Sequence, residues 1–171
     1  HIPGDSTSIS SNIVWKIIED QNNNLWIGTG DGGLCKYNYE TNQFKAFHHN
    51  PKDSTSLSND LVLSLFIDSN NNLWAGTRNG LNKLYYNNEN KVVFKRYNTK
   101  DGLSSETINA IVEDKNHNLW LTTTEGLTRF NTIDLTCSKY FVEDGLQDNQ
   151  FSINCICYDS INGNIIAGGI N

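Results

Sequence analysis

Three segments rich in Asp and Asn contain the residues whose types and spacing best fit a chemical role. Asp20, Asn22 and Asn24 alternate along the first segment, and the pattern Asp-x-Asn-x-Asn returns from Asp68 and from Asp114. A calcium loop begins this way, but it also needs a glycine at position six and a carboxylate at position twelve. Position six is leucine in all three copies. Because Asp and Asn also favour tight turns, we interpret the segments as hairpin turns and expect neither a metal nor a cofactor.

The tryptophans are of two kinds. Trp26, Trp74 and Trp120 stand at the same place in successive copies of one motif, which indicates packing between repeated units, because a core position repeats and a binding site rarely does. Trp15 occupies a position that varies between copies, as a ligand-facing position would. Its counterparts are Leu63, Asn109 and Asn154.

The histidines and cysteines supply no further set with catalytic or metal-binding spacing. They are His1, His48, His49 and His117, and Cys35, Cys137, Cys155 and Cys157. Cys155 and Cys157 lie two apart on one expected strand, so they point to one face and are poorly placed to bridge each other. We expect the cysteines to be small buried side chains. No Ser-His-Asp set can be placed, and the sequence therefore predicts no catalytic residues and no enzyme.

The elements that position these residues follow from the repeat itself. The segment Asp-(four residues)-Leu-Trp-x-Gly-Thr has its Trp position at Trp26, Trp74, Trp120 and, in a degenerate copy, Ile166, so the intervals are 48, 46 and 46 residues. A period in the forties built from short strands is typical of a β-propeller blade of four antiparallel strands. We therefore predict an all-β fold, a propeller fragment of about three and a half blades, with blades at approximately 12–48, 60–97, 107–142 and 152–171.

Strand bounds follow from the alternation of apolar and turn residues. We expect inner strands at 13–19, 61–67, 108–113 and 153–158, outer strands at 44–48, 94–97 and 139–142, and no helix. The loops before the inner strands match in pairs. Residues 3–10 resemble residues 51–58, and residues 101–103 resemble residues 144–146.

Strand parity puts two kinds of connection on one face of the predicted propeller. The long loops before the inner strands and the turns between second and third strands must emerge on the same side. Asp31, Arg78 and Glu125 lie in those turns. Because binding residues concentrate on loops held by a rigid scaffold, we predict that these three residues and Trp15 contact a ligand.

Both ends of the sequence fall inside a repeat when the copies are aligned. Propellers close with 4–8 blades, so we expect a larger parent ring. Open blade faces expose strand edges and apolar side chains, which leads us to expect self-association.

Charge and hydropathy exclude several partners. The net charge is −6, with acidic and basic residues interspersed, whereas nucleic acid and anionic membranes require a basic face. No apolar stretch reaches 18 residues, and no signal peptide opens the sequence. We expect no contact with nucleic acid and none with a membrane by this segment.

The repeat resembles the two-component regulator propeller repeat over essentially the whole chain. The matching segments in the first copy are Ile17–Asp20, Asn24–Thr29 and Gly33–Leu34, and they return at Phe66–Asp68 with Gly80–Leu81 and at Val112–Asp114 with Gly126–Leu127. The fourth copy departs from the pattern, with Ile166 for Trp and Gly169 for Thr.

This resemblance implies the periplasmic sensor region of a hybrid two-component histidine kinase, as found in Bacteroidetes. In that family, seven-bladed rings detect glycan fragments and control genes of polysaccharide utilisation, while the kinase lies elsewhere in the protein. An oligosaccharide is the ligand that the resemblance implies. Two alternatives stay open: a propeller lyase of the streptogramin-inactivating type, which carries a similar Asn-Leu-Trp strand, and a protein-interaction propeller without a small ligand.

Overall fold

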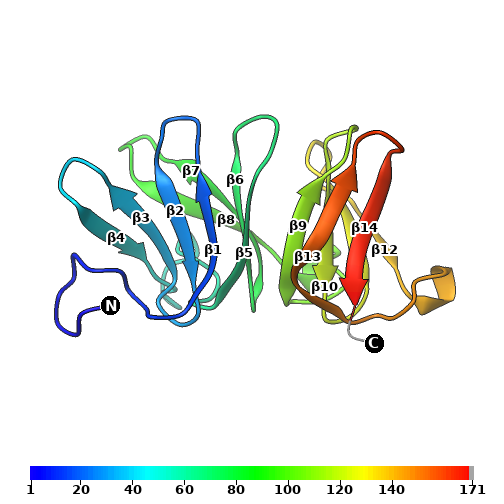
Figure 1. The fold of residues 1–171 in the computed structure, drawn as a ribbon, viewed down its shortest axis with the longest axis horizontal. Coiled ribbons are helices and arrows are strands. Elements are labelled where there is room, and N and C mark those ends of the chain that lie inside the picture. The colour runs from blue at the N-terminus through cyan, green and yellow to red at the C-terminus, as the bar shows by residue number, and fades with distance from the viewer. Residues whose placement is uncertain (170–171) are drawn as a thin grey trace.

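Four antiparallel sheets stand side by side in the computed structural model, which describes residues 1–169 (Figure 1). The first sheet holds β1 (Val14–Glu19), β2 (Leu25–Thr29), β3 (Leu34–Asn38) and β4 (Gln43–Phe47). The second holds β5 (Val62–Ile67), β6 (Leu73–Thr77), β7 (Gly80–Tyr86) and β8 (Val92–Tyr97). The third holds β9 (Ile108–Glu113), β10 (Asn118–Thr123), β11 (Leu127–Asn131) and β12 (Cys137–Tyr140), and the fourth β13 (Phe151–Asp159) and β14 (Asn164–Gly169). This confirms the predicted propeller of three complete blades and one pair of strands.

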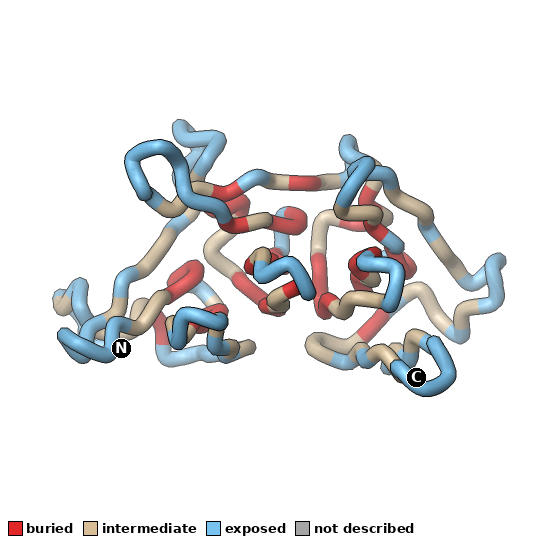
Figure 2. The backbone as a smooth tube through the Cα atoms, turned by 90° about the horizontal axis from the view of Figure 1, so that it is seen from above, coloured by how far each residue is buried: buried red, intermediate tan, exposed pale blue. Residues whose placement is uncertain are grey.

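The sheets radiate from a row of inner strands. Each sheet pairs its strands in chain order, and the inner strands β1, β5, β9 and β13 adjoin one another in that sequence. Seen from above, the buried residues gather along the middle of an arc, and the exposed ones lie in the loops around it (Figure 2).

Two short helical turns were not expected from the sequence. They are the 3₁₀ segments η1 (Thr99–Asp101) and η2 (Val142–Asp144) in the shorter loops before β9 and β13. Each ends at a glycine in the left-handed region, Gly102 with φ 103° and Gly145 with φ 100°. The paired Asp-Gly-Leu segments of the sequence are therefore helical turns closed by glycine, a conformation that costs other residues more.

The hydrophobic core lies between blades. Trp26 of the first blade packs with Leu65 and Phe94 of the second, and Trp74 of the second packs with Leu119 and Phe130 of the third. The tryptophans of the first two repeats therefore face the following blade, whereas Trp120 of the third is half-buried and stacks on Tyr140 of its own blade. Burying an aromatic side chain of this size is among the larger single contributions to a core.

The expectation that all cysteines are buried is wrong for the last blade. Cys35 is buried and Cys137 half-buried, whereas Cys155 and Cys157 on β13 are exposed, and all four are free thiols. The physical reason is that, within residues 1–169, no further sheet packs on the far side of β13 and β14.

Candidate functional site

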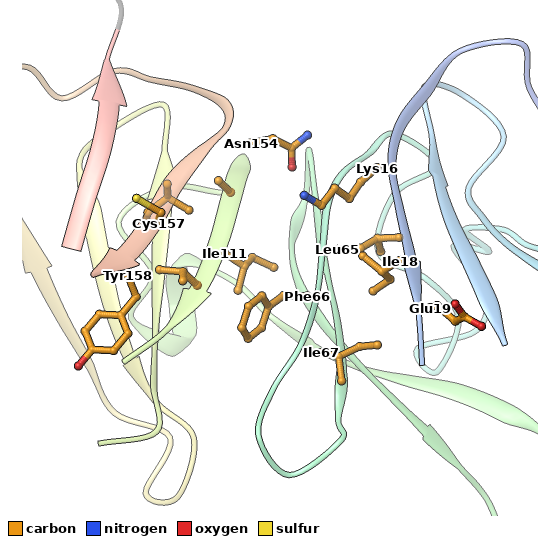
Figure 3. A pocket seen from close by; sticks show the side chains of 13 residues that line it. Lys16, Ile18, Glu19, Leu65, Phe66, Ile67, Ile111, Asn154, Cys157 and Tyr158 are labelled. Atoms are coloured by element: carbon orange, nitrogen blue, oxygen red, sulfur yellow. The ribbon is translucent and has the colours of Figure 1, made fainter. Parts of the chain in front are cut away.

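A cavity of about 450 Å³ lies where the inner strands of all four blades converge (Figure 3). Its middle is apolar, with Phe66 of β5 near Ile111 of β9. The polar side chains around it are Lys16, Glu19, Asn154 and Tyr158. Apolar walls with a few polar groups are the usual composition of a ligand pocket, and the volume is within the range of small-molecule sites.

Asn154 ties three inner strands together at one end of this cavity. Its amide nitrogen donates to the carbonyl of Trp15 at 3.1 Å and to that of Leu63 at 3.2 Å. The residue has φ 58° and lies where β13 shifts register between Phe151 and Ile156. The extra residues of this bulge turn the side chain across to β1 and β5, which a simple alignment of the repeats does not reveal.

The four predicted ligand residues lie outside the central cavity. Trp15 is 40% exposed and contributes its carbonyl, not its ring, to the contact with Asn154. Asp31, Arg78 and Glu125 are exposed on the β2–β3, β6–β7 and β10–β11 turns of successive blades. None of the four lines the cavity between the inner strands. Their contact with a ligand stays a prediction.

Polar residues two positions before each inner strand connect the loops to these turns, a feature that the sequence reasoning missed. Asp60 accepts the backbone N–H of His49 at 2.7 Å through its carboxylate, and its carbonyl accepts the N–H of Gly33 at 2.9 Å. Glu106 accepts the backbone N–H of Thr99 at 3.2 Å through its carboxylate, and its carbonyl accepts the N–H of Gly80 at 2.6 Å. The recurrence of a polar residue there, Asn12, Asp60, Glu106 and Asn149, is the signal that could have revealed it.

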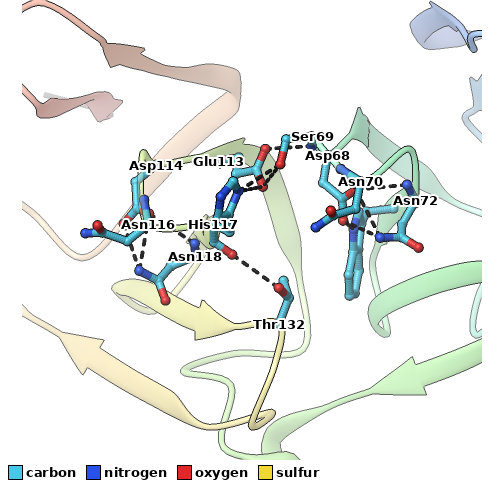
Figure 4. A network of polar contacts seen from close by, with 11 residues as sticks. Asp68, Ser69, Asn70, Asn72, Glu113, Asp114, Asn116, His117, Asn118 and Thr132 are labelled. Carbon is cyan, nitrogen blue, oxygen red and sulfur yellow. Dashed lines mark hydrogen bonds and ion pairs between the residues drawn. The ribbon is translucent and has the colours of Figure 1, made fainter.

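The Asp-x-Asn-x-Asn segments are turns whose carboxylates hold the tryptophans. The Trp26 indole N–H donates to Asp20, that of Trp74 to Asp68 and that of Trp120 to Asp114, each at 2.8 Å. Figure 4 shows the second and third of these turns.

The same carboxylates also close the turns. Asp20 accepts the backbone and side-chain N–H groups of Asn24 at 2.9 Å. Burial would raise the pKa of Asp20, but the hydrogen bonds from Trp26 and Asn24 outweigh burial and lower it. Each carboxylate is thus occupied by donors of its own repeat, which accounts for the spacing of the motif without a cation.

Ser69, Glu113 and His117 form a polar contact between the second and third blades (Figure 4). Repeat spacing did not reveal this contact, because Ser69 and His117 lie 48 residues apart in the chain. Ser69 donates to Glu113 from its backbone N–H and its hydroxyl, both at 2.8 Å, and the His117 Nδ1 lies 2.8 Å from the hydroxyl and 3.2 Å from the carboxylate. His117 has φ 62°, which turns it back toward Glu113.

This trio does not have the geometry of a nucleophile relay. In such a relay one imidazole nitrogen faces the hydroxyl and the other faces the acid. Both contacts of His117 use Nδ1, and the hydroxyl itself donates to the acid. Within residues 1–169, no group of three or more His, Cys, Asp or Glu side chains is arranged to hold a metal ion.

These features define the class of the molecule as a segment of β-propeller with its inner strands around a cavity. Residues 8–31, 56–79 and 102–125 match the model of the two component regulator propeller family. The chain therefore carries three segments that match the two-component regulator propeller repeat.

Solved structures with a similar fold include extracellular domains of two-component systems. The chain is similar to the extracellular domain of one hybrid two-component system from B. thetaiotaomicron, with 28% identity and a TM-score of 0.82, covering 100% of this chain and 22% of that one. A second such domain from B. thetaiotaomicron has 25% identity and a TM-score of 0.75 over 97% of this chain and 23% of its own. The chain thus spans about a fifth of the length of these domains.

More distant matches carry information on the fold alone. Virginiamycin B lyase from Staphylococcus aureus has 11% identity and a TM-score of 0.64, over 92% of this chain and 49% of the lyase. Among curated proteins, none matches the sequence. Across the described residues, no helix has the length and apolar character that crossing a bilayer requires.

Proposed function

We propose that the chain is a non-catalytic, ligand-sensing propeller segment in the periplasmic part of a hybrid two-component sensor. The observation that carries the proposal is the cavity between β1, β5, β9 and β13, because one ligand there would touch every blade at once. A ligand that binds one arrangement of blades better than another shifts the population toward it, and that shift is the signal. The family repeats and the similarity to extracellular domains of two-component systems support this role.

The ligand that we propose is a glycan fragment. Phe66 offers aromatic surface inside the cavity, and the polar ends of Lys16 and Asn154 can exchange hydrogen bonds with hydroxyl groups (Figure 3). The cavity's mixed lining fits a sugar, which has both apolar C–H faces and polar edges.

The test is calorimetric titration of the chain with a panel of oligosaccharides, repeated with Lys16→Ala. Lys52→Ala is the matched control, because Lys52 is exposed on a loop away from the cavity. A hydrogen bond to a charged group contributes about 1.5–3 kcal/mol, so Lys16→Ala is expected to weaken binding by about tenfold or more. A panel without a single binder, or equal binding by the Lys16 and Lys52 variants, would refute the cavity as the glycan site.

The absence of catalysis needs its own assay. The chain is incubated with a streptogramin B antibiotic, and the products are followed by mass spectrometry. We expect the antibiotic to stay intact, because the likeness to virginiamycin B lyase, at 11% identity, is one of fold alone. Linearised antibiotic would favour the lyase alternative.

We also propose that this segment self-associates. Ile13, Val14 and Ile17, within and just before β1, are exposed apolar side chains. Burying such a patch in a second copy is favourable at about 25 cal/mol per Å² of apolar surface. Light scattering after size exclusion is expected to show a dimer that Ile17→Lys weakens. A monomer at all concentrations would contradict the proposal.

A further inference from the structure

The loops before the first two inner strands, residues 1–12 and 49–60, have nearly the same hydrogen bonds. Asp5 accepts the backbone and hydroxyl of Thr7 at 2.8 and 2.6 Å, and Asp53 accepts those of Thr55 at 2.8 and 2.7 Å. The Ser8 hydroxyl donates to the Asp5 carbonyl at 3.0 Å, as the Ser56 hydroxyl does to the Asp53 carbonyl at 2.9 Å. The Phe44 backbone N–H donates to the Thr7 carbonyl at 2.8 Å, as that of Phe94 does to the Thr55 carbonyl at 2.7 Å. The two loops therefore have one conformation, and each is fixed to the outer strand of its own blade.

In the second blade, this loop is filled by an arginine of that outer strand. Arg96 on β8 donates from Nε to Ser56 O at 2.7 Å. Its Nη2 donates to Asp53 O at 2.8 Å, to Ser56 Oγ at 2.7 Å and to Leu57 O at 3.1 Å. The loop is thus a cradle of oxygen acceptors that fits a planar guanidinium group.

In the first blade, the residue at the same place is alanine. The bonds from Phe44 and Phe94 fix the register, so Ala46 on β4 corresponds to Arg96 on β8. A pocket of about 580 Å³ opens there, lined by Asp5, Ser8 and Ala46 among others. The oxygen acceptors of the loop remain, but the chain supplies no guanidinium group for them.

We propose that this pocket, defined by the loop of residues 1–12 and by Ala46, binds the guanidinium group of an arginine-type ligand. The second blade shows the occupied form of the same cradle within the same molecule. A lysine ammonium is a poorer match, because it lacks the planar fork that reaches several acceptors at once.

The pocket is lined by one carboxylate, that of Asp5, and one lysine, Lys45. Hydrogen bonds from the side chain and backbone of Thr7 lower the pKa of Asp5, so its carboxylate is ionised at neutral pH. Lys45, which also lines the pocket, lies 5.3 Å from the Phe47 ring centroid, and Lys95 lies 5.2 Å from the Tyr97 ring centroid beside the filled cradle. A lysine at this position is therefore compatible with a bound guanidinium group.

This site is separate from the central cavity and does not depend on the proposed sensing function. It lies at the outer strand β4, and the two pockets share no lining residue. Its other lining groups with a possible charge are His1 and His48, and the His48 Nδ1 is 3.6 Å from the Asp60 carboxylate.

The test is a titration of the chain with ethylguanidinium chloride, followed by the backbone amide resonances of Thr7, Ser8 and Ile9. We expect saturable shifts with a Kd at least tenfold lower than that for ethylammonium chloride, which controls for charge and salt. In Ala46→Arg the new side chain fills the pocket, and the shifts are expected to be lost. Absence of saturable shifts, equal response to ethylammonium, or unchanged binding in a folded Ala46→Arg variant would overturn the proposal.

A second variant reproduces the site in the other blade. Arg96→Ala empties the matched cradle, so ethylguanidinium is expected to shift Thr55, Ser56 and Leu57 in this variant and to leave them unshifted in the original chain. Absence of that shift in a folded variant would count against the cradle as a guanidinium site. If either variant fails to fold, the comparison of ethylguanidinium with ethylammonium on the original chain still decides the outcome.

Discussion

Replacement of Asp68 by Asn tests the idea that the repeat's carboxylate exists to hold its tryptophan. Asp68 is 4% exposed; its Oδ2 accepts the Trp74 indole N–H and the Asn72 amide at 2.8 Å, and its Oδ1 accepts the backbone of Asn70 and Asn72. Asparagine keeps one oxygen for the backbone donors and presents an NH₂ group to the indole. Trp74 is 1% exposed, so its N–H cannot turn to water instead.

The magnitude follows from the one buried donor that loses its partner. An unsatisfied buried donor costs about 1–3 kcal/mol, and the lost bond is to a charged group, so we expect a loss of about 2 kcal/mol. Because the free energy of unfolding falls by about 2 kcal/mol per M of urea, the urea concentration at the unfolding midpoint is expected to fall by about 1 M. Circular dichroism and tryptophan fluorescence are measured together, because coinciding transitions are required before one free energy is assigned.

The chain contains its own control in the fourth repeat. Asp159 accepts the backbone N–H groups of Ile161 and Asn162 and the Asn162 amide, but Ile166 stands where the indole would be. Asp159→Asn is therefore expected to leave the midpoint unchanged within error. The reasoning is refuted if Asp68→Asn has the original midpoint, or if both variants lose the same amount.

Two further outcomes follow from the structure. Burial would raise the pKa of Asp114, but the hydrogen bonds from Trp120 and Asn118 outweigh burial and lower it. The stabilisation that this carboxylate contributes is therefore complete above its unfolded-state pKa of about 3.9, and it is lost as the pH falls through the lower folded-state pKa. As the pH is lowered through this range, the midpoint temperature of thermal unfolding should therefore fall less for Asp114→Asn than for the original chain. Parallel curves for the two would contradict this expectation. Gly80 and Gly163 both have positive φ, but only at Gly80 would a Cβ meet another backbone atom, the Tyr97 carbonyl. In urea titration, Gly80→Ala is expected to lower the free energy of unfolding by about 1–3 kcal/mol more than Gly163→Ala does, and equal losses would disprove the contact argument.

Alignment of the repeats predicted the position of some candidate site residues but not of others. Asp31, Arg78 and Glu125 were assigned to one face by strand parity, and the bonds from Gly33 and Gly80 to Asp60 and Glu106 do join the turns and loops of that face. Alignment gave no information on which side chains line the central cavity. There the bulge in β13 turns Asn154 toward strands more than 90 residues away in the chain, at separations of 139 and 91.

The sequence by itself determined the repeat, the blade and the packing role of its tryptophans. The repeat and the blade depend on contacts within one copy, such as the indole bond from Trp74 to Asp68 six positions earlier, and short-range spacing is visible in a linear pattern. The packing role of the tryptophans is visible because one position recurs in successive copies. Only the tertiary structure decided what differs between copies: the meeting of Ser69 with His117, the bridge from Asn154, and the pocket that Ala46 leaves where Arg96 fills its own blade. These contacts join residues of different elements, and their geometry is set by how sheets and loops pack together, which sequence spacing does not specify.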